Sequence, residues 1–130
     1  MRSLHDEPKR RVLLVDDDPS MLKIFSRYLE AAGFEVARAV NGEEALVAAH
    51  QQSPELIILD VMLPKLNGYE VCQKLKQDPA TKRIPVILFT AKGEPEEQVT
   101  GFMFGANAYL SKTCQAKELL DQVTQLLAHE

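Results

Sequence analysis

The chain has 130 residues, of which 45% are hydrophobic and 26% are charged, and its net charge is −4. This length and composition are typical of one globular domain with a hydrophobic core, and the chain is short for two ordinary domains. The negative net charge argues against nucleic acid or an anionic lipid surface as an electrostatic partner.

The first predicted strand is the apolar run "RVLLVD" at residues 11–16, and a helix is expected after it. Asp18 before Pro19 is a favourable helix start, because the carboxylate accepts free N–H groups and proline fits the first helical position. Apolar residues then recur every three or four positions, as expected for one buried helix face: Leu22, Phe25, Leu29 and Ala32. Gly33 predicts the end of this helix.

Two more strands are predicted in the middle of the chain, and a helix is expected after each. The mixed segment "GFEVARA" indicates an edge strand, whereas "ELIILD" is a continuous apolar run, typical of a strand covered on both faces. Both helices open with an Asn that is followed three residues later by a Glu, which resembles a capping box: Asn41 with Glu44, and Asn67 with Glu70. We expect Val71 and Leu75 of the later helix to point inward.

The last two strand predictions are the apolar run "PVILFT" and the weaker segment "NAYLSK". Between them, Glu94-Pro95 predicts the start of a helix with Val99 and Phe102 as its core contacts. A final helix is expected from about residue 116 to residue 128, with this apolar stripe: Leu119, Leu120, Val123 and Leu127. Five alternations of strand and helix predict a doubly wound α/β sheet with right-handed crossovers.

Polar side chains end four of the predicted strands: Asp16 and Asp17, Asp60, Thr90, and Lys112. Ligands of such sheets bind beyond the carboxyl ends of the strands, so we expect these groups to share one rim. Neighbouring carboxylates raise one another's pKa unless a cation neutralises them, and Mg²⁺ prefers such oxygen ligands. Lys112 and Thr90 could bind an anion beside the metal, and a carboxylate could be the nucleophile. This set predicts phosphoryl transfer.

Each of these side chains, taken singly, has a simpler explanation. An Asp at a strand end is usually a turn or cap residue, a Thr there usually reflects β-propensity, and a Lys is usually a solvated surface charge. Together these explanations require four coincidences at one edge of one sheet, so we favour a single site.

Four motifs, in this order, make the chain resemble a receiver domain of the bacterial two-component response regulators: "LLVDDDPS", "LIILDVMLPKLNGYE", "IPVILFTAK" and "GANAYLSK". The resemblance runs from about Arg11 to Leu127. It implies a flavodoxin-like (βα)5 sandwich with a five-stranded parallel sheet of strand order 2-1-3-4-5. It also implies an N-terminal tail over residues 1–10 and a receiver domain over residues 11–130.

The resemblance implies a role for each residue of the rim. Asp60 would be the phosphoacceptor, taking a phosphoryl group from a histidine kinase or a small phosphodonor. The Mg²⁺ ligands would be Asp17 directly, Asp16 mainly through water, Asp60, and the backbone carbonyl of Met62. Thr90 and Lys112 would contact the phosphoryl group, and Tyr109 matches the aromatic residue that turns inward when Thr90 moves. Such a protein transfers phosphate only to itself and hydrolyses it slowly, so we do not class it as an enzyme.

Partners and location follow as further expectations. A sensor histidine kinase or a phosphotransfer protein would act upstream, and an unknown protein would bind downstream at the surface of the fourth helix, fifth strand and fifth helix. Met103 in that region is either an exposed apolar contact or packs beside Phe102. No stretch approaches the ~20 apolar residues of a membrane span, and no signal peptide is evident. We therefore expect a cytoplasmic protein without direct contact to nucleic acid or membrane, and with reduced thiols at Cys72 and Cys114.

One position departs from the family pattern. Thr113 follows Lys112, where receivers usually have a proline after a cis peptide bond. A cis bond costs a non-proline residue ~2.5–4 kcal/mol, so we predict a trans 112–113 bond. The long, flexible lysine stem should still bring its ammonium group to Asp60.

Two other functions compete with the signalling switch. The first is a haloacid-dehalogenase-type phosphatase, with Asp16 as the nucleophile of an Asp-x-Asp motif; the chain leaves no room for the cap domain of that family. The second is a pseudo-receiver that binds partners without being phosphorylated, which the presence of Asp60, Thr90 and Lys112 disfavours.

Overall fold

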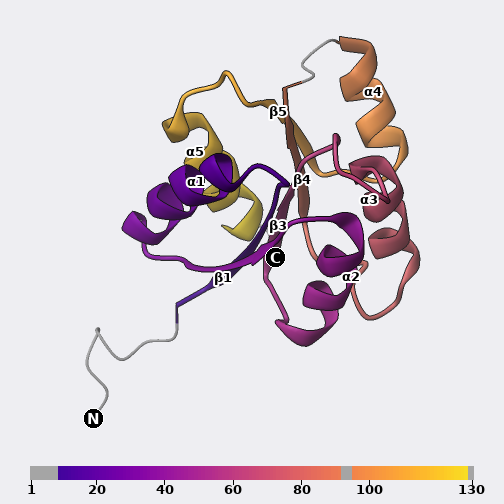
Figure 1. Ribbon diagram of the computed structural model, residues 1–130, viewed down its shortest axis with the longest axis horizontal. Helices are drawn as coiled ribbons and strands as arrows, with labels where there is room; N and C mark the ends of the chain where they lie inside the picture. The colour runs from indigo at the N-terminus through magenta and orange to yellow at the C-terminus, as the bar shows by residue number, and fades with distance from the viewer. Residues whose placement is uncertain (1–8, 92–94, 129–130) are drawn as a thin grey trace.

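The computed structural model describes residues 9–91 and 95–128 (Figure 1). Its strands are β1 (Arg11–Val15), β2 (Glu35–Ala39), β3 (Leu56–Leu59), β4 (Val86–Thr90) and β5 (Ala108–Ser111). Its helices are α1 (Pro19–Ala31), α2 (Gly42–Gln51), α3 (Gly68–Gln77), α4 (Pro95–Met103) and α5 (Ala116–Ala128). The predicted alternation of strand and helix is confirmed throughout this described part.

The strands form one parallel sheet in the order β2-β1-β3-β4-β5, as predicted. The mixed segment β2 lies at an edge, whereas the apolar runs β1, β3 and β4 lie inside the sheet. Val15 pairs with Leu59, so the residues that follow β1 and β3 leave the sheet side by side. This register brings the predicted carboxylates of the two strands together.

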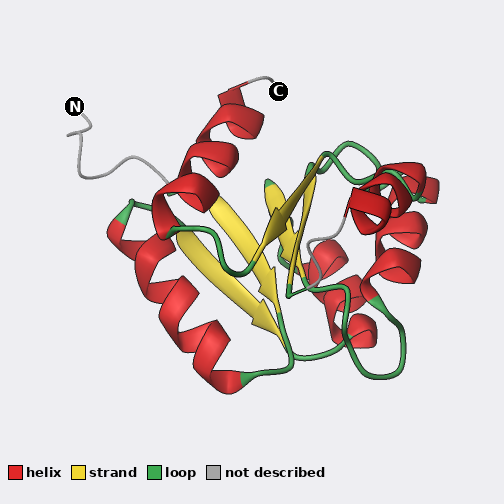
Figure 2. Ribbon diagram, turned by 90° about the horizontal axis from the view of Figure 1, so that it is seen from above, coloured by secondary structure: helices red, strands yellow, loops and turns green. Residues whose placement is uncertain are grey.

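Helices cover both faces of the sheet: α1 and α5 lie on one face, and α2, α3 and α4 on the other (Figures 1 and 2). Alternate residues of β1 face the two layers, which is why its apolarity is continuous. The core under α1 and α5 includes Val12, Leu14, Leu22, Phe25, Leu29, Leu119, Val123 and Leu127. The core under the other layer includes Leu13, Val15, Ala45, Ala49, Val71, Cys72 and Leu75.

Side-chain oxygens cap the first three helices at the predicted positions. The bonds are Ser20 N–H to Asp18 (2.9 Å), Glu44 N–H to Asn41 (2.8 Å) and Glu70 N–H to Asn67 (3.0 Å). Each bond satisfies a free N–H group of a first helical turn. Gly33, at φ +98°, ends α1 as predicted, because glycine adopts this conformation without strain. Ala32, predicted for the buried stripe, is instead the exposed cap after α1.

The buried face of α4 differs from the prediction. Val99 and Phe102, predicted as core contacts, are 59% and 51% exposed. The helix instead turns Gly101 toward the sheet, where a Cβ atom would lie 2.8 Å from side-chain atoms of Leu88 and Tyr109. Because α4 approaches the sheet through Gly101, the side chains of Val99 and Phe102 point outward. The apolar character of these two positions alone could not predict this orientation of the helix.

Some predictions fall outside the described part of the chain. Glu94 is one, and residues 1–8 are most of the predicted tail, so the boundaries of tail and domain remain predictions. Arg10 is described, and its Nε donates to Glu55 Oε2 at 2.5 Å. Within residues 9–91 and 95–128, no helix combines the length and apolarity that crossing a bilayer requires.

Candidate functional site

Three carboxylates meet at the carboxyl edge of the sheet, as predicted. Asp16 and Asp17 follow β1, and Asp60 follows β3. One carboxylate oxygen from each residue lies within 4.8 Å of the others. Asp16 and Asp60 are each only 4% exposed, whereas Asp17 is exposed to solvent. The acidic cluster is therefore buried on one side and open to solvent on the other.

Lys112 lies directly against two of these carboxylates. Its Nζ donates to Asp16 Oδ2 at 2.6 Å and to Asp60 Oδ2 at 2.8 Å. The lysine side chain is 14% exposed, so both ion pairs are largely shielded from water. The predicted approach of Lys112 to Asp60 is confirmed. The bond to Asp16 was not predicted.

Burial and these ion pairs shift the pKa values of Asp16 and Lys112 in opposite directions. Burial raises the pKa of Asp16, and the hydrogen bonds from Lys112 and from the Asp18 N–H only partly oppose that effect. For Lys112, burial lowers the pKa, but hydrogen bonds to Asp16 and Asp60 outweigh it, so that its pKa is raised. Lys112 is therefore a cation at neutral pH. It lies next to Asp60, where it can contact an anion that binds beside this carboxylate.

Local hydrogen bonds hold the chain around Lys112. The described part contains no cis peptide bond, so the Lys112–Thr113 bond is trans, as predicted. The Lys112 N–H donates to the Thr90 carbonyl at 2.8 Å, which anchors the loop to β4. The Thr113 N–H donates to Ser111 Oγ at 3.2 Å, and the two hydroxyls lie 2.8 Å apart. The Cys114 N–H closes the turn on the Ser111 carbonyl at 3.0 Å.

The loop between β3 and α3 wraps tightly around Asp60. The Met62 N–H donates to Asp60 Oδ1 at 3.0 Å, which orients the carboxylate. The Gly68 N–H donates to the Val61 carbonyl at 2.8 Å. A Cβ atom on Gly68 would lie 2.2 Å from the Asp60 carbonyl oxygen, so only glycine allows α3 to begin this close to Asp60.

Thr90 and Tyr109, the two predicted switch residues, both point into the protein. Thr90 ends β4 and is fully buried, and Tyr109 on β5 is only 8% exposed. Tyr109 shares a hydrogen bond with Tyr69 on α3. Sequence reasoning did not identify Tyr69, although its place directly after the capping residue Asn67 and the first helical residue Gly68 was a usable signal.

A groove of about 520 Å³ opens beside the acidic cluster. Its lining consists of Asp17, Val61, Met62, Leu63, Pro64, Asn67 and Tyr69. The Met62 side chain is 55% exposed there. The groove therefore gives solvent and small molecules access to the cluster from the side of Asp17.

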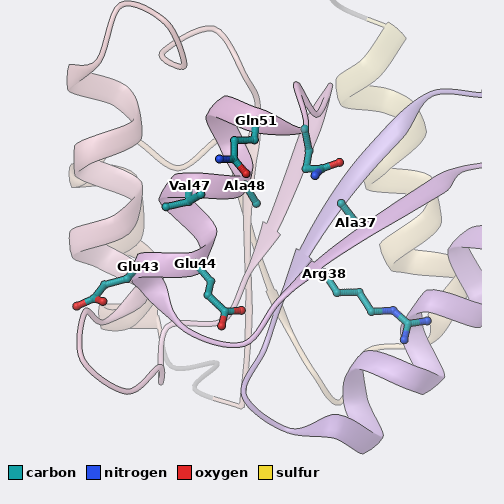
Figure 3. Close-up of a pocket in the computed structure, with 8 residues that line it drawn as sticks. Ala37, Arg38, Glu43, Glu44, Val47, Ala48 and Gln51 are labelled. Atoms are coloured by element: carbon teal, nitrogen blue, oxygen red, sulfur yellow. The ribbon is translucent and has the colours of Figure 1, made fainter.

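A second pocket, of about 560 Å³, lies between α2 and the edge strand β2 (Figure 3). Charged and apolar side chains mix in its wall, including Arg38, Glu43, Glu44 and Val47. None of the predicted site residues lines it, so this pocket is separate from the acidic cluster.

The acidic cluster has the donor set of a site for a hard divalent cation. Carboxylate oxygens are the ligands that Mg²⁺ prefers, usually one or two of them together with waters. Asp17 makes no hydrogen bond or ion pair with another described residue, and it is exposed, so it is available as a ligand. The residues present thus fit such an ion.

Comparison with known proteins agrees with this geometry. The family model described as the response regulator receiver domain matches residues 12–124. The DNA-binding dual master transcriptional regulator RpaA of Synechocystis sp. is 44% identical over 117 residues, which are 90% of this chain and 48% of RpaA. The phosphate regulon transcriptional regulatory protein PhoB of Rhizobium meliloti is 38% identical over 90% of this chain and 52% of PhoB. The chain spans about half the length of these relatives.

Solved structures share the fold over nearly their whole length. The chemotaxis response regulator CheY4 of Vibrio cholerae has a TM-score of 0.85 and 31% identity, covering 92% of this chain and 99% of that one. A receiver domain protein (CheY-like) from Methanospirillum hungatei has a TM-score of 0.86 and 28% identity, covering 94% and 96%. The sheet order and the helix layers described above are therefore common to these proteins.

Proposed function

Because this chain belongs to the response regulator receiver domain family, we propose that it is a signalling switch with Asp60 as its phosphoacceptor. Receiver domains act in phosphorylation-dependent signalling and are not conventional enzymes. One observation carries the assignment of Asp60: its carboxylate lies in the acidic cluster and accepts a 2.8 Å hydrogen bond from Lys112. A nucleophile, neighbouring carboxylates and a fixed cation are the parts that phosphoryl transfer needs.

The proposed transfer starts when a carboxylate oxygen of Asp60 attacks the phosphorus of a phosphohistidine on a kinase. The new O–P bond forms as the N–P bond breaks, and the electron pair stays on the imidazole nitrogen, which then takes a proton. The Lys112 ammonium stabilises negative charge on the phosphoryl oxygens. The Thr90 hydroxyl can donate to one of them. The phosphorylated state would end by slow hydrolysis, in which water attacks the phosphorus and the Asp60 carboxylate leaves.

The same residues would hold Mg²⁺. Asp17 and Asp60 would be direct ligands together with the Met62 carbonyl, and Asp16 would act mainly through water. When bound, the ion supplies positive charge that offsets the phosphoryl and carboxylate charges. Lys112 offsets part of the negative charge of Asp16 and Asp60, and the Met62 N–H keeps the Asp60 carboxylate oriented.

Upstream and downstream partners follow from this role. We infer a histidine kinase or phosphotransfer protein as the phosphodonor, and an unknown protein that binds the α4–β5–α5 surface. Met103 is 82% exposed there, and Val99 and Phe102 are exposed beside it, which supports an apolar contact with a partner over packing of Met103 against Phe102.

The name of the Synechocystis relative describes DNA binding, but the matched segment is 48% of that protein. With a net charge of −4, this chain itself is proposed not to contact DNA.

The two competing functions have less support. Asp16, the nucleophile of the phosphatase alternative, is buried, and its oxygens already accept bonds from Asp18 N–H and Lys112. The family match also opposes a phosphatase. A pseudo-receiver would not need Asp60, Lys112 and Thr90 at one end of the sheet.

Incubation with Mg²⁺ and acetyl phosphate, followed by intact mass measurement, tests the proposal. We expect one phosphoryl adduct on the parent protein and none on the Asp60→Asn variant. Asp121→Asn is the matched control, because Asp121 is an exposed aspartate of α5 with a 67% exposed side chain. An adduct that survives in Asp60→Asn would assign the chemistry to another carboxylate, and no adduct on the parent would support the pseudo-receiver.

A further inference from the structure

Residues 111–114 form a tight turn around Lys112, the cation of the proposed site. The Cys114 N–H donates to the Ser111 carbonyl at 3.0 Å, which closes a β-turn with Lys112 and Thr113 at its central positions. The Lys112 N–H donates to the Thr90 carbonyl at 2.8 Å, and Thr90 pairs with Ser111 in the sheet. The backbone before and after Lys112 is therefore held by hydrogen bonds.

The hydroxyl of Ser111 adds further bonds inside this turn. Its Oγ accepts from the Thr113 N–H at 3.2 Å and lies 2.8 Å from Thr113 Oγ1, so that one hydroxyl donates to the other. A serine oxygen that accepts from the N–H two residues later is the arrangement of a Ser/Thr turn. Both contacts come from Thr113. A proline at this position could provide neither, because proline has no N–H and no hydroxyl.

The position of the Lys112 ammonium group depends on the direction in which the side chain leaves the backbone. Its Nζ lies 2.6 Å from Asp16 Oδ2 and 2.8 Å from Asp60 Oδ2, and the side chain is only 14% exposed. Ordering a long, flexible lysine stem costs conformational entropy, so a fixed starting direction favours these ion pairs. The turn sets that direction, because Lys112 is one of its central residues.

We propose that Ser111 is a positioning residue, whose hydroxyl bonds to Thr113 and so holds a trans turn that directs Lys112 toward Asp16 and Asp60. The Ser111–Thr113 pair takes the place of the proline that receivers usually have after this lysine. The consequence for phosphoryl transfer rests on the proposed function, in which Lys112 stabilises charge on the phosphoryl group. The direction of Lys112 itself does not depend on phosphorylation.

Competitive acetylation of lysines by an N-hydroxysuccinimide ester, measured by peptide mass spectrometry, tests the direction of Lys112. An ammonium group that carboxylates hold and shield from water reacts slowly, and it reacts faster once it is released. We compare the rate at Lys112 in the parent, Ser111→Ala, Ser111→Thr and Thr113→Val proteins without Mg²⁺. Lys117 is the internal standard, because its side chain is 83% exposed.

Lys76 is the control for a general loosening of the fold. Its Nζ donates to the Ile84 carbonyl at 2.8 Å and to Asn107 Oδ1 at 2.9 Å. These partners precede β4 and β5, so they lie at the end of the sheet opposite Lys112. A variant that only destabilises the protein therefore raises the rates at both lysines, whereas a change in the turn raises the rate at Lys112 alone.

We expect Lys112 to react roughly threefold to tenfold faster in Ser111→Ala, the range for loss of an ordinary hydrogen bond or two. Thr113→Val keeps the N–H and should show a smaller increase, and Ser111→Thr should react at the parent rate. Adding Thr113→Val to Ser111→Ala should change nothing more, because the Thr113 hydroxyl has only Ser111 as a partner among the described residues.

An unchanged rate at Lys112 in Ser111→Ala, or an equal rise at Lys76, would overturn the proposal. If Ser111→Ala does not fold, the comparison of Thr113→Val with Thr113→Ser decides in the same way. A faster reaction at Lys112 in Thr113→Val, with the parent rate in Thr113→Ser, would support the pair of hydroxyls.

The rate of phosphoryl transfer from acetyl phosphate with Mg²⁺ tests the consequence for Asp60. We expect transfer to be about threefold to tenfold slower in Ser111→Ala and to return to the parent rate in Ser111→Thr. Thr124→Val is the control, because Thr124 is an exposed threonine of α5. A parent that takes up no phosphoryl group would contradict the proposed function, and the acetylation rates would still decide the direction of Lys112. Equal transfer rates in the parent and Ser111→Ala would overturn the consequence alone.

Discussion

We expect Met62 to influence how water approaches the proposed phosphoryl group. Its side chain is 55% exposed and lines the groove beside Asp17. A thioether cannot orient an attacking water, whereas an amide can donate and accept. We predict that Met62→Asn speeds decay of the phosphorylated protein about tenfold, which corresponds to ~1.4 kcal/mol. Phosphoryl loss after removal of acetyl phosphate measures this, with Met103→Asn as the control. Equal decay rates for Met62→Asn and the parent would refute the role of Met62.

Ser26 on α1 offers a test of buried polarity away from the site. It is fully buried, and its hydroxyl has no hydrogen-bond partner among the described residues. An unsatisfied buried group of this kind costs ~1–3 kcal/mol. We predict that Ser26→Ala raises the free energy of unfolding in urea by about 1 kcal/mol. Ser20→Ala on the exposed side of α1 corrects for helix propensity. Equal gains in both variants would show that the Ser26 hydroxyl is not destabilising.

Individual contacts in the site were only partly predictable. The strand-end positions of Asp16, Asp60 and Lys112 predicted that they meet, because parallel strands bring their carboxyl ends to one edge. The bond from Lys112 to Asp16 depends on where a long flexible side chain settles, which strand ends do not determine. Tyr69 was missed for a similar reason, since its partner Tyr109 lies on another element far along the chain.

At the scale of elements, a histidine–aspartate pair joins the ends of α2 and α3. His50 Nδ1 lies 2.8 Å from the Leu46 carbonyl oxygen, and Nε2 lies 2.7 Å from Asp78 Oδ2. The backbone bond to Leu46, followed by the bond to Asp78, raises the pKa of His50 above its ordinary value of 6.5. The protonated form is therefore favoured in the folded protein.

This raised pKa predicts a pH dependence with a definite sign. Folding holds the proton of His50 more tightly, so the stabilisation is complete below the ordinary pKa of 6.5 and is lost as pH rises through the higher folded value. We expect the melting temperature to fall as the pH is raised from about 6 to about 8. His50→Gln should remove this slope. A slope that persists in the variant would assign the dependence to another group.

The positions of the strands and helices were predicted better than the face that each helix buries. Continuous apolar runs predicted β1, β3 and β4, because strands covered on both faces need apolar residues at every position. The face of α4 was predicted wrongly, since Gly101 sets its contact with the sheet and carries no hydrophobic signal. The outward turn of Val99 and Phe102 is the result, and it provides the apolar part of the proposed partner surface.

At the scale of the whole molecule, the strand order places the acidic cluster. The chain leaves β1 for β2 on one side and returns to β3 on the other, so the order reverses between β1 and β3. Ligands of doubly wound sheets bind at such a point, beyond the carboxyl ends of the strands. Asp16 and Asp60 follow these two strands, so the topology itself concentrates negative charge at the point of reversal.

Mg²⁺ should therefore stabilise the folded protein. We propose that the ion binds the assembled cluster and not the unfolded chain, so at ten times its dissociation constant it would add about 1.4 kcal/mol to the free energy of unfolding. We expect the melting temperature to rise with Mg²⁺ concentration, and Asp17→Ala to abolish most of the rise. Asp121→Ala on exposed α5 is the control for loss of one negative charge. A rise that Asp17→Ala retains in full would contradict this metal site.

The most direct test of the central claim is chemical identification of the phosphorylated residue. Borohydride reduces an aspartyl phosphate to homoserine, which marks the position permanently for peptide mass spectrometry. After incubation with Mg²⁺ and acetyl phosphate, we predict homoserine at position 60 and unmodified aspartate at positions 16 and 17. Homoserine at position 16, or at no position in a protein that remains folded, would contradict the assignment of Asp60 as the phosphoacceptor.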